Sequence, residues 1–360
     1  MTVHENIPNM RSETQQGKLA IADDVAMLRA AVDLTRDISA PDARIYWSDF
    51  LVSAVLGYAG LAVAIVAQSL PLALGGALIA MLALYRASSF IHELTHIRSG
   101  ALHGFRMGWN VLVGIPLLIP SFLYENVHTL HHARTRYGTV DDPEYLPLAL
   151  MKPWSLPVFL VVAMLAPVAL ILRFAVLAPL SLVVPSLRRM VVERYSALSI
   201  NPAFRRRQPE GAFRRQWLWQ ETGASIWAIV MLGSVMVIGW RPLLVWVAVF
   251  SGTAVLNQLR TLVAHLWENE GGAITVTAQY LDSVNVPPPA VLAPLWAPVG
   301  LRYHALHHLL PSLPYHALGE AHRRMTASLG PQSTYQGASY SGLVPLVARL
   351  ARSTMRSGGG

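Results

Sequence analysis

Four apolar stretches, arranged as two closely spaced pairs, limit what this chain can fold into. The first pair runs from Phe50 to Leu70 and from Leu72 to Ile91, and the second from Gly223 to Gly239 and from Leu243 to Leu259. A helix of about 20 residues is about 30 Å long, which matches the hydrocarbon core of a bilayer. The linkers within each pair are too short for anything except a tight turn, so we expect two transmembrane helical hairpins.

The composition also indicates a chain that spends much of its length in lipid. Hydrophobic residues make up 53% of the 360 residues and charged residues only 13%, whereas soluble domains have about 25% charged residues. We therefore expect an all-α polytopic membrane protein with about four transmembrane helices. Its predicted parts are a soluble N-terminal segment (1–45), a central membrane domain (46–325) and a C-terminal tail (326–360). Cysteine is absent, which excludes disulfides and cysteine-ligated zinc or iron–sulfur sites.

Basic residues are concentrated between the two hairpins. The net charge is +8, and eight arginines crowd one segment. Such a segment could bind nucleic acid or anionic lipid headgroups, but between hydrophobic spans a cytoplasmic loop explains it better. We therefore expect no nucleic-acid partner and a cytoplasmic location for this segment. The arginines are Arg188, Arg189, Arg194, Arg205, Arg206, Arg207, Arg214 and Arg215.

Two further apolar stretches do not fit the hairpin pattern. Val111 to Leu123 is too short to cross a bilayer and contains Pro116 and Pro120. Leu156 to Val184 is long enough for one crossing, but a single crossing would move the arginine-rich segment to the outside. An even number of crossings, zero or two, avoids this, and the prolines of the stretch suit a broken, re-entrant or interfacial hairpin.

Nine of the thirteen histidines lie near the ends of these stretches, and eight of them have spacings typical of metal ligands. His92 and His96 are four residues apart, and two further groups share the spacing H-x2-HH. Helical residues three or four positions apart lie on one face, so each group can direct its imidazoles at one ion. Imidazole suits iron, zinc, copper and nickel, and nine imidazoles suit two ions better than one. The predicted ligands are His92, His96, His128, His131, His132, His265, His304, His307 and His308.

The isolated histidines need separate treatment. His265 is included because it follows the last apolar stretch, although a lone histidine is more often a core or surface residue. We interpret His103, His316 and His322 as ordinary core or surface residues, with His316 a candidate hydrogen-bond partner of a ligand. His4 lies in the polar N-terminal segment. The clusters lie within about a turn of the cytoplasmic end of a span or in loops on that side, which predicts a histidine-lined di-metal cap on the cytoplasmic face.

Together these motifs resemble those of the membrane fatty acid desaturase family. That family has three histidine boxes, H-x3-4-H, H-x2-3-HH and H/Q-x2-HH, placed between and around two hydrophobic hairpins. Here the boxes match His92 to His96, His128 to His132 and His304 to His308, and the run from Leu309 to His316 is also similar to the family. The resemblance covers residues 50–322.

The resemblance implies an O2-dependent di-iron oxidase that introduces a double bond into a fatty acyl chain of a lipid. The eight box histidines would bind two irons, and His265 stands where family members often add a ligand. Some acyl-CoA members have an asparagine four residues before that histidine, but this chain has Thr261 there, so that ligand does not carry over. Candidate hydrogen-bond partners of the ligands are Glu93, Asp141, Asp142, Glu144 and Asp282.

The resemblance also implies a separate electron donor. The third box begins with His304 rather than glutamine, which argues against the subgroup that carries a fused cytochrome b5. The chain also lacks a haem-binding His-Pro-Gly-Gly sequence. We therefore expect electrons from an electron-transfer protein of the ferredoxin or cytochrome b5 type.

Two other activities remain open. A hydroxylase or ketolase of a fatty acid, alkane, sterol or carotenoid would use the same scaffold. Membrane alkane hydroxylases have an H-x3-HH second box and an Asn-Tyr-containing motif that this chain lacks, which favours desaturation. The sequence His92-Glu93-Leu-Thr-His96 also fits the H-E-x-x-H signature of an intramembrane zinc protease with Glu93 as general base, but it leaves seven clustered histidines unexplained.

Overall fold

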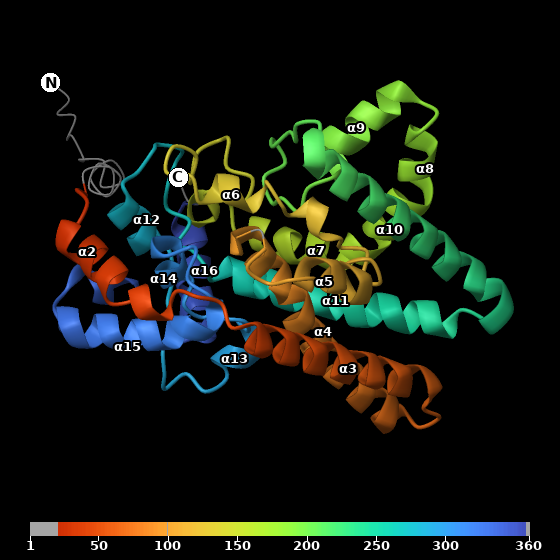
Figure 1. The fold of residues 1–360 in the computed structure, drawn as a ribbon, viewed down its shortest axis with the longest axis horizontal. Coiled ribbons are helices and arrows are strands. Elements are labelled where there is room, and N and C mark those ends of the chain that lie inside the picture. Colours follow the sequence, from red (N-terminus) through yellow and green to blue (C-terminus); the bar gives the residue numbers. More distant parts are fainter. Residues whose placement is uncertain (1–20, 99, 358–360) are drawn as a thin grey trace, which may run out of the picture.

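All long elements of the chain are helices, and two helical hairpins extend to one side of the molecule (Figure 1). The computed structural model describes residues 21–98 and 100–357. A cap of shorter helices and loops covers the hairpin ends that lie opposite the turns. The hairpins are α3 (Ala43–Val66) with α4 (Leu70–His96), and α10 (Gly211–Ile238) with α11 (Arg241–Leu262).

Local sequence signals set the ends of these helices. The side chain of Asp42 accepts a hydrogen bond from the N–H of Arg44 (2.8 Å) and caps α3. Pro71 and Pro242 stand in the first turns of α4 and α11, where a missing N–H costs no hydrogen bond. Gly239 ends α10 with a φ of 77°, which glycine adopts without strain. The two hairpin turns therefore follow from residues within them.

The helices of the first hairpin approach each other closely where two glycines face one another. A Cβ on Gly60 would lie 2.8 Å from the carbonyl oxygen of Gly76, and a Cβ on Gly76 would lie 2.8 Å from that of Gly60. Close backbone packing through small residues is a common way for helices to associate in a membrane. Larger core side chains around the hairpins include Leu84, Phe90, Trp217, Trp246 and Phe250.

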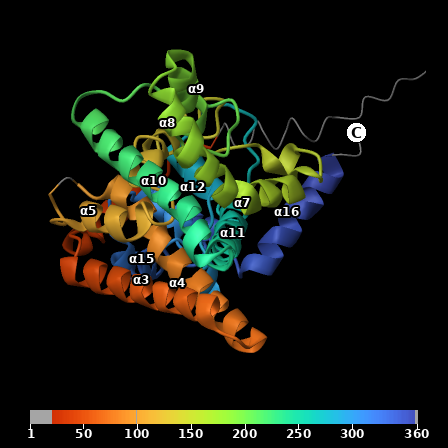
Figure 2. The same cartoon turned by 90° about the vertical axis from the view of Figure 1, so that its right-hand side faces the viewer.

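Five helices of the described residues are long and apolar enough to cross a membrane, one more than the four we expected. Four of them form the two predicted hairpins. The fifth, Ser155–Ser181, joins α7 (Ser155–Leu172), the π-helical η5 (Arg173–Leu177) and α8 (Ala178–Ser181). Figure 2 shows α11 nearly along its axis, and in that view α7 runs across the page. The fifth helix therefore has a different direction from α11.

The shorter apolar stretch, Val111 to Leu123, does not form a candidate span, as its length predicted. It is divided between the π-helical η2 (Asn110–Gly114) and the 3-10 helix η3 (Ser121–Leu123), and α5 (Phe105–Trp109) precedes it. This region lies beside the last turns of α4 and borders the cap.

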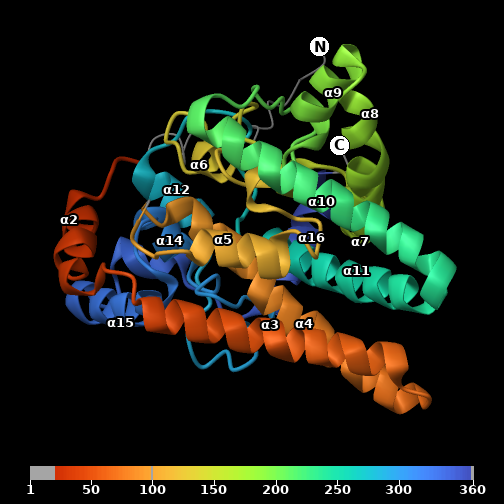
Figure 3. The ribbon, with the colours of Figure 1, turned by 45° about the vertical axis from the view of Figure 1, so that its right-hand side comes forward.

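The cap brings together segments that are far apart in the sequence, and Figure 3 shows α2, α12, α14 and α15 on the side opposite the hairpin turns. Met27 and Ala31 of α2 (Val25–Asp33) pack against α15 (Leu318–Leu329). Both predicted terminal segments contribute, since α16 (Leu343–Ser357) also packs here; the division into three parts stays a prediction. The other elements are η1 (Arg36–Ile38), α6 (His128–His131), η4 (Leu148–Leu150), α9 (Pro185–Tyr195), α12 (Val276–Asp282), α13 (Ala293–Trp296), α14 (His304–Leu309), η6 (Tyr315–Ala317) and η7 (Thr334–Ala338).

Candidate metal centre

The nine histidines predicted as metal ligands all converge inside the cap, where α4 and α11 end. They form two groups. Within each group, one ligand nitrogen from every residue lies within 4.8 Å of all the others. The first group is His92, His96, His128, His132 and His307, and the second group is His131, His265, His304 and His308.

Each H-x2-HH motif contributes to both groups, which differs from the expectation that one motif can serve one ion. In α6, His128 and His132 belong to the first group, whereas His131 belongs to the second. In α14, His307 belongs to the first group, whereas His304 and His308 belong to the second. Residues four apart differ by about 40° around a helix axis, whereas the residue three positions along lies about 60° to the other side. A single helical turn can therefore direct imidazoles at two neighbouring ions.

The Nε2 atoms of the histidines face one another at distances that suit a shared ion. In the first group His132 Nε2 lies 3.0 Å from that of His128 and 3.1 Å from that of His307. Two nitrogens bound at right angles to an ion about 2.1 Å away would be about 3.0 Å apart. In the second group the distances are 3.0 Å for His265–His304, 3.1 Å for His304–His308 and 3.2 Å for His131–His265.

Several ring nitrogens of the first group are buried without a hydrogen-bond partner among the described residues. These are both nitrogens of His92, Nε2 of His96 and Nδ1 of His132. A buried polar atom without a partner costs about 1–3 kcal/mol, and a bound cation would offset that cost. The donor set, its spacing and these unpaired atoms therefore fit two metal ions held by imidazoles.

Burial keeps most of these imidazoles neutral, which is the form that binds a metal. It lowers the pKa of His132 and His265 well below the usual histidine value. His131 is an exception: burial acts to lower its pKa, but the charge and hydrogen bond of Asp142 leave it raised. The pKa is lowered in the same way, with burial as the main cause, for His128, His304, His307 and His308.

Two of the predicted carboxylate partners contact ligand histidines directly. Asp142 Oδ2 lies 2.9 Å from Nδ1 of His131, and Glu144 Oε1 lies 2.8 Å from Nδ1 of His128. Burial raises the pKa of Glu144 to about 7. Such partners hold the ring hydrogen on Nδ1 and leave Nε2 free for the metal.

A third predicted carboxylate acts through a tyrosine. The hydroxyl of Tyr137 donates to Asp282 (2.8 Å) and lies 2.8 Å from Nδ1 of His265. Asp282 is buried, whereas Asp141 is exposed to solvent. Asp282 therefore orients His265 indirectly, and Asp141 lies outside this set.

The carboxylate of Glu93, which would be the base of the protease alternative, is held by hydrogen bonds from two other segments of the chain. Its Oε2 accepts hydrogen bonds from the hydroxyl of Tyr46 and from the N–H of Tyr315 (3.1 Å). Its Oε1 lies 3.6 Å from Nδ1 of His92, which is beyond hydrogen-bond distance. Glu93 thus links α3, α4 and the loop after the third box behind His92.

Several neighbours of the candidate ligands were not predicted from the sequence. The hydroxyl of Tyr124 lies 2.8 Å from Nδ1 of His128, and the Gln279 amide nitrogen lies 2.8 Å from Nδ1 of His308. The spacing of four residues between Tyr124 and His128 was a usable signal, whereas Gln279 is 29 residues from its partner. Tyr137, described above, likewise had no local signal.

The residues that we did not expect to bind metal lie outside both groups. His316 accepts the N–H of Asp42 (3.1 Å), and His322 pairs with the Tyr335 hydroxyl (2.8 Å). The Thr261 hydroxyl donates to a backbone carbonyl of its own helix (3.0 Å). His4 falls outside the described residues.

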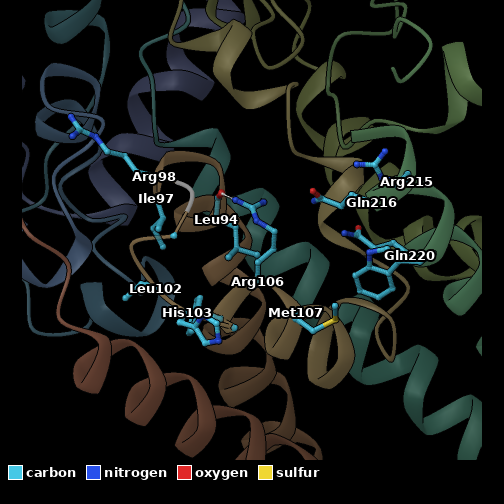
Figure 4. Close-up of a pocket in the computed structure, with 14 residues that line it drawn as sticks. Leu94, Ile97, Arg98, Leu102, His103, Arg106, Met107, Arg215, Gln216 and Gln220 are labelled. Atoms are coloured by element: carbon cyan, nitrogen blue, oxygen red, sulfur yellow. Dashed lines mark hydrogen bonds between the residues drawn. The ribbon is translucent and has the colours of Figure 1, made fainter. Parts of the chain in front are cut away.

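A separate cavity of about 500 Å³ lies beside the last turn of α4, and His103 is part of its lining. Figure 4 shows Arg106 in its wall, with Gln216 and Gln220 on the side of α10. Arg106 and Gln216 both bind the carboxylate of Glu125, at 2.5 Å and 2.7 Å. Its lining includes Leu94, which points away from the histidine face of α4, so the cavity is separated from the metal centre by that helix.

Comparisons with known proteins agree with this site. The model of the fatty acid desaturase family matches residues 67–340. A ceramide hydroxylase of Caulobacter vibrioides (strain NA1000 / CB15N) is 50% identical over 333 residues, which are 92% of this chain and 95% of that protein. No solved structure matches the chain. Enzymes of this family are membrane oxidoreductases with a di-iron centre. With its five apolar helices, the chain is a multi-pass membrane protein, and it belongs to the fatty acid desaturase family.

Proposed function

We propose that this protein is a di-iron membrane oxidase that hydroxylates a ceramide or a closely related N-acyl lipid. The observation that carries the proposal is the 50% identity to a ceramide hydroxylase across 92% of the chain. The sequence motifs favoured desaturation, and the match to the desaturase family keeps desaturation of the same lipid as the second candidate.

The nine histidines of the two groups would hold the irons. When bound, the irons would supply the activation of O2 that oxidation of an unactivated C–H bond requires. Asp142, Glu144 and the Tyr137–Asp282 pair hold the imidazoles in the orientation that presents Nε2. Hydroxylation replaces one hydrogen of the lipid by a hydroxyl group. It consumes O2, two electrons and two protons and releases one water, with the electrons coming from a ferredoxin or cytochrome b5 type protein.

Four crossings, with the metal centre on the cytoplasmic face, form the second part of the proposal. Support comes from Arg173, which lies within the fifth candidate span yet is buried and paired with Glu221 of α10 at 2.6 Å. The direction of α7 across α11 also suits an interfacial segment (Figure 2). A Ser186→Cys variant should resist a membrane-impermeant thiol reagent added to intact cells, and labelling from outside would refute this topology.

Lipid profiling tests the reaction. We expect cells that make ceramides and express the chain to accumulate a lipid with one additional oxygen atom, detected by mass spectrometry. A His307→Ala/His308→Ala variant should lack this product, whereas His103→Ala, outside both groups, should retain it. Loss of two hydrogens in place of a gained oxygen would establish the desaturase instead. Purified protein that contains zinc or no metal, together with no new lipid, would overturn the proposal.

A further inference from the structure

Arginines inside the candidate spans differ in their partners. Arg86 and Arg173 each bind a carboxylate, at 2.5 Å and 2.6 Å. Arg260, in the last turn of α11, forms no ion pair with the described residues, and its Nη2 lies 3.3 Å from the neutral amide oxygen of Asn257. A charged side chain without a counter-charge is uncommon in a span, and Arg260 lies near the end of one, where its head can reach a polar group.

Arg260 lies in the last turn of α11, five residues before His265 of the second group, and α11 packs against α4, which carries His92 of the first group. The charge of Arg260 acts on His92 of the first group and on His265 and His304 of the second. It also interacts with the hydroxyl of Tyr85 on α4. Tyr85 lies on the same face of α4 as His92, two turns earlier, which is about 10 Å along the axis. The Arg260 side chain therefore starts from the end of α11 at which both groups of histidines gather.

The hydrogen-bonding capacity of Arg260 is not filled by its neighbours. Its Nε is buried, and none of the described residues accepts a hydrogen bond from it. The residue as a whole is only partly buried, so part of it borders open space. A guanidinium has five N–H donors and no acceptor, so it requires oxygen atoms. The hydrocarbon chain of a lipid offers none, whereas its polar end does.

We propose that Arg260 binds the carbonyl oxygen at the polar end of the lipid substrate and thereby selects which carbon is oxidised. This inference rests on the proposed lipid oxidation. A carbonyl held beside both histidine groups brings the adjoining chain carbons to the metals. Oxidation is then directed to the carbons nearest the carbonyl, with O2 as oxidant and the electron-transfer protein as reductant. An amide of a ceramide and the carboxylate of a free fatty acid share this recognition chemistry.

Binding without turnover tests the contact itself. The full chain in detergent, kept free of O2, is titrated with ceramide, palmitic acid or hexadecane. We expect Arg260→Gln to weaken binding of ceramide or of palmitic acid about tenfold or more, because a hydrogen bond to a charged group is lost. Binding of hexadecane, which has no oxygen, should not change. Loss with ceramide alone identifies an amide carbonyl as the group that Arg260 binds, and loss with palmitic acid alone identifies a carboxylate.

Arg241→Gln, at the other end of α11, is the matched control. Unchanged affinity of Arg260→Gln for both oxygen-containing probes would overturn the proposal.

The position of oxidation tests the consequence. Tandem mass spectrometry should place the new group of the wild-type product on the carbons next to the carbonyl, and a mid-chain or methyl-end position would refute the inference. Arg260→Gln should keep its iron, raise KM more than it lowers kcat, and spread the oxidised positions. If that variant loses iron, Arg260→Met, which keeps the length of the side chain but removes every N–H donor, replaces it: full iron with an unchanged KM and product position would also refute the inference. If the chain binds the lipid through Arg260 but oxidises no lipid, the result would count against the proposed function and not against this inference.

Discussion

The carboxylate of Asp142 lies 2.9 Å from Nδ1 of His131, whose opposite ring nitrogen faces His265 at 3.2 Å. The same carboxylate accepts the backbone N–H groups of Gly138 and Glu144, each at 2.8 Å. The loop that follows the second histidine box is thus folded around the group that orients one of its histidines. The orientation of the His131 ring and the conformation of this loop are therefore coupled through Asp142.

Replacing Asp142 should weaken the second group. We expect Asp142→Asn to lower iron affinity about 10- to 100-fold, because the partner that fixes the His131 ring is altered. The neighbouring Asp141→Asn is the matched control, since Asp141 is exposed, and it should bind iron like the wild type. Iron per protein chain, measured by elemental analysis after dialysis against a chelator, distinguishes the two. Equal iron retention in both variants would contradict this role of Asp142.

Glu93→Gln should have a smaller effect than Asp142→Asn. The Glu93 carboxylate is 3.6 Å from Nδ1 of His92, and the glutamine can still accept from Tyr46 and Tyr315. We therefore expect oxidase turnover and iron content to be largely retained. Turnover and elemental analysis on one preparation test this. Abolished activity in a fully metallated variant would instead favour the general-base role that the H-E-x-x-H signature implies.

Two adjacent glycines of α4 should respond oppositely to the same substitution. A Cβ on Gly76 meets the backbone of α3 at 2.8 Å, whereas a Cβ on Gly75 meets nothing within 4 Å. Gly76→Ala should destabilise the protein by about 1–3 kcal/mol, because the hairpin helices must move apart. Gly75→Ala should be neutral or stabilising by up to about 1 kcal/mol. Thermal unfolding in one detergent compares them, and identical melting temperatures would contradict the close crossing of α3 and α4.

The buried ion pairs of Glu221 should matter more than exposed ones. Glu221 binds Arg173 (2.6 Å) and Arg188 (2.7 Å). Glu221→Gln leaves a buried guanidinium without its counter-charge, and we expect a loss of about 3–5 kcal/mol. Glu320, which also pairs with two arginines but on the surface, is the control, and Glu320→Gln should change the melting temperature little. A Glu221→Gln variant as stable as Glu320→Gln would show that the pair is dispensable.

Local patterns predicted the helices of both hairpins, because hydropathy and turn residues act within a few positions. They predicted less well where the helices end. The apolar run before the first box stops at Ile91, but α4 continues to His96, since hydrogen bonding continues where side chains become polar. The stretch from Leu156 to Val184 was expected to cross zero or two times. Its helix Ser155–Ser181 is long and apolar enough to be a fifth candidate span, and the number of its crossings stays a prediction. Arg173 of this helix and Glu221 of α10, which form an ion pair, are 48 residues apart and carry no joint signal in the sequence.

The sequence by itself determined the four helices of the two hairpins, the spacing of the histidine boxes and the end of the hairpins at which they gather. These features depend on helix periodicity and on the chemistry of neighbouring residues. Tertiary structure decided which histidines share a group, since His131 meets His265 across 134 positions. It also decided that Asp282 reaches His265 through Tyr137. Spacing sets the direction of a side chain only relative to its own helix axis, whereas packing of the whole chain sets what that side chain meets.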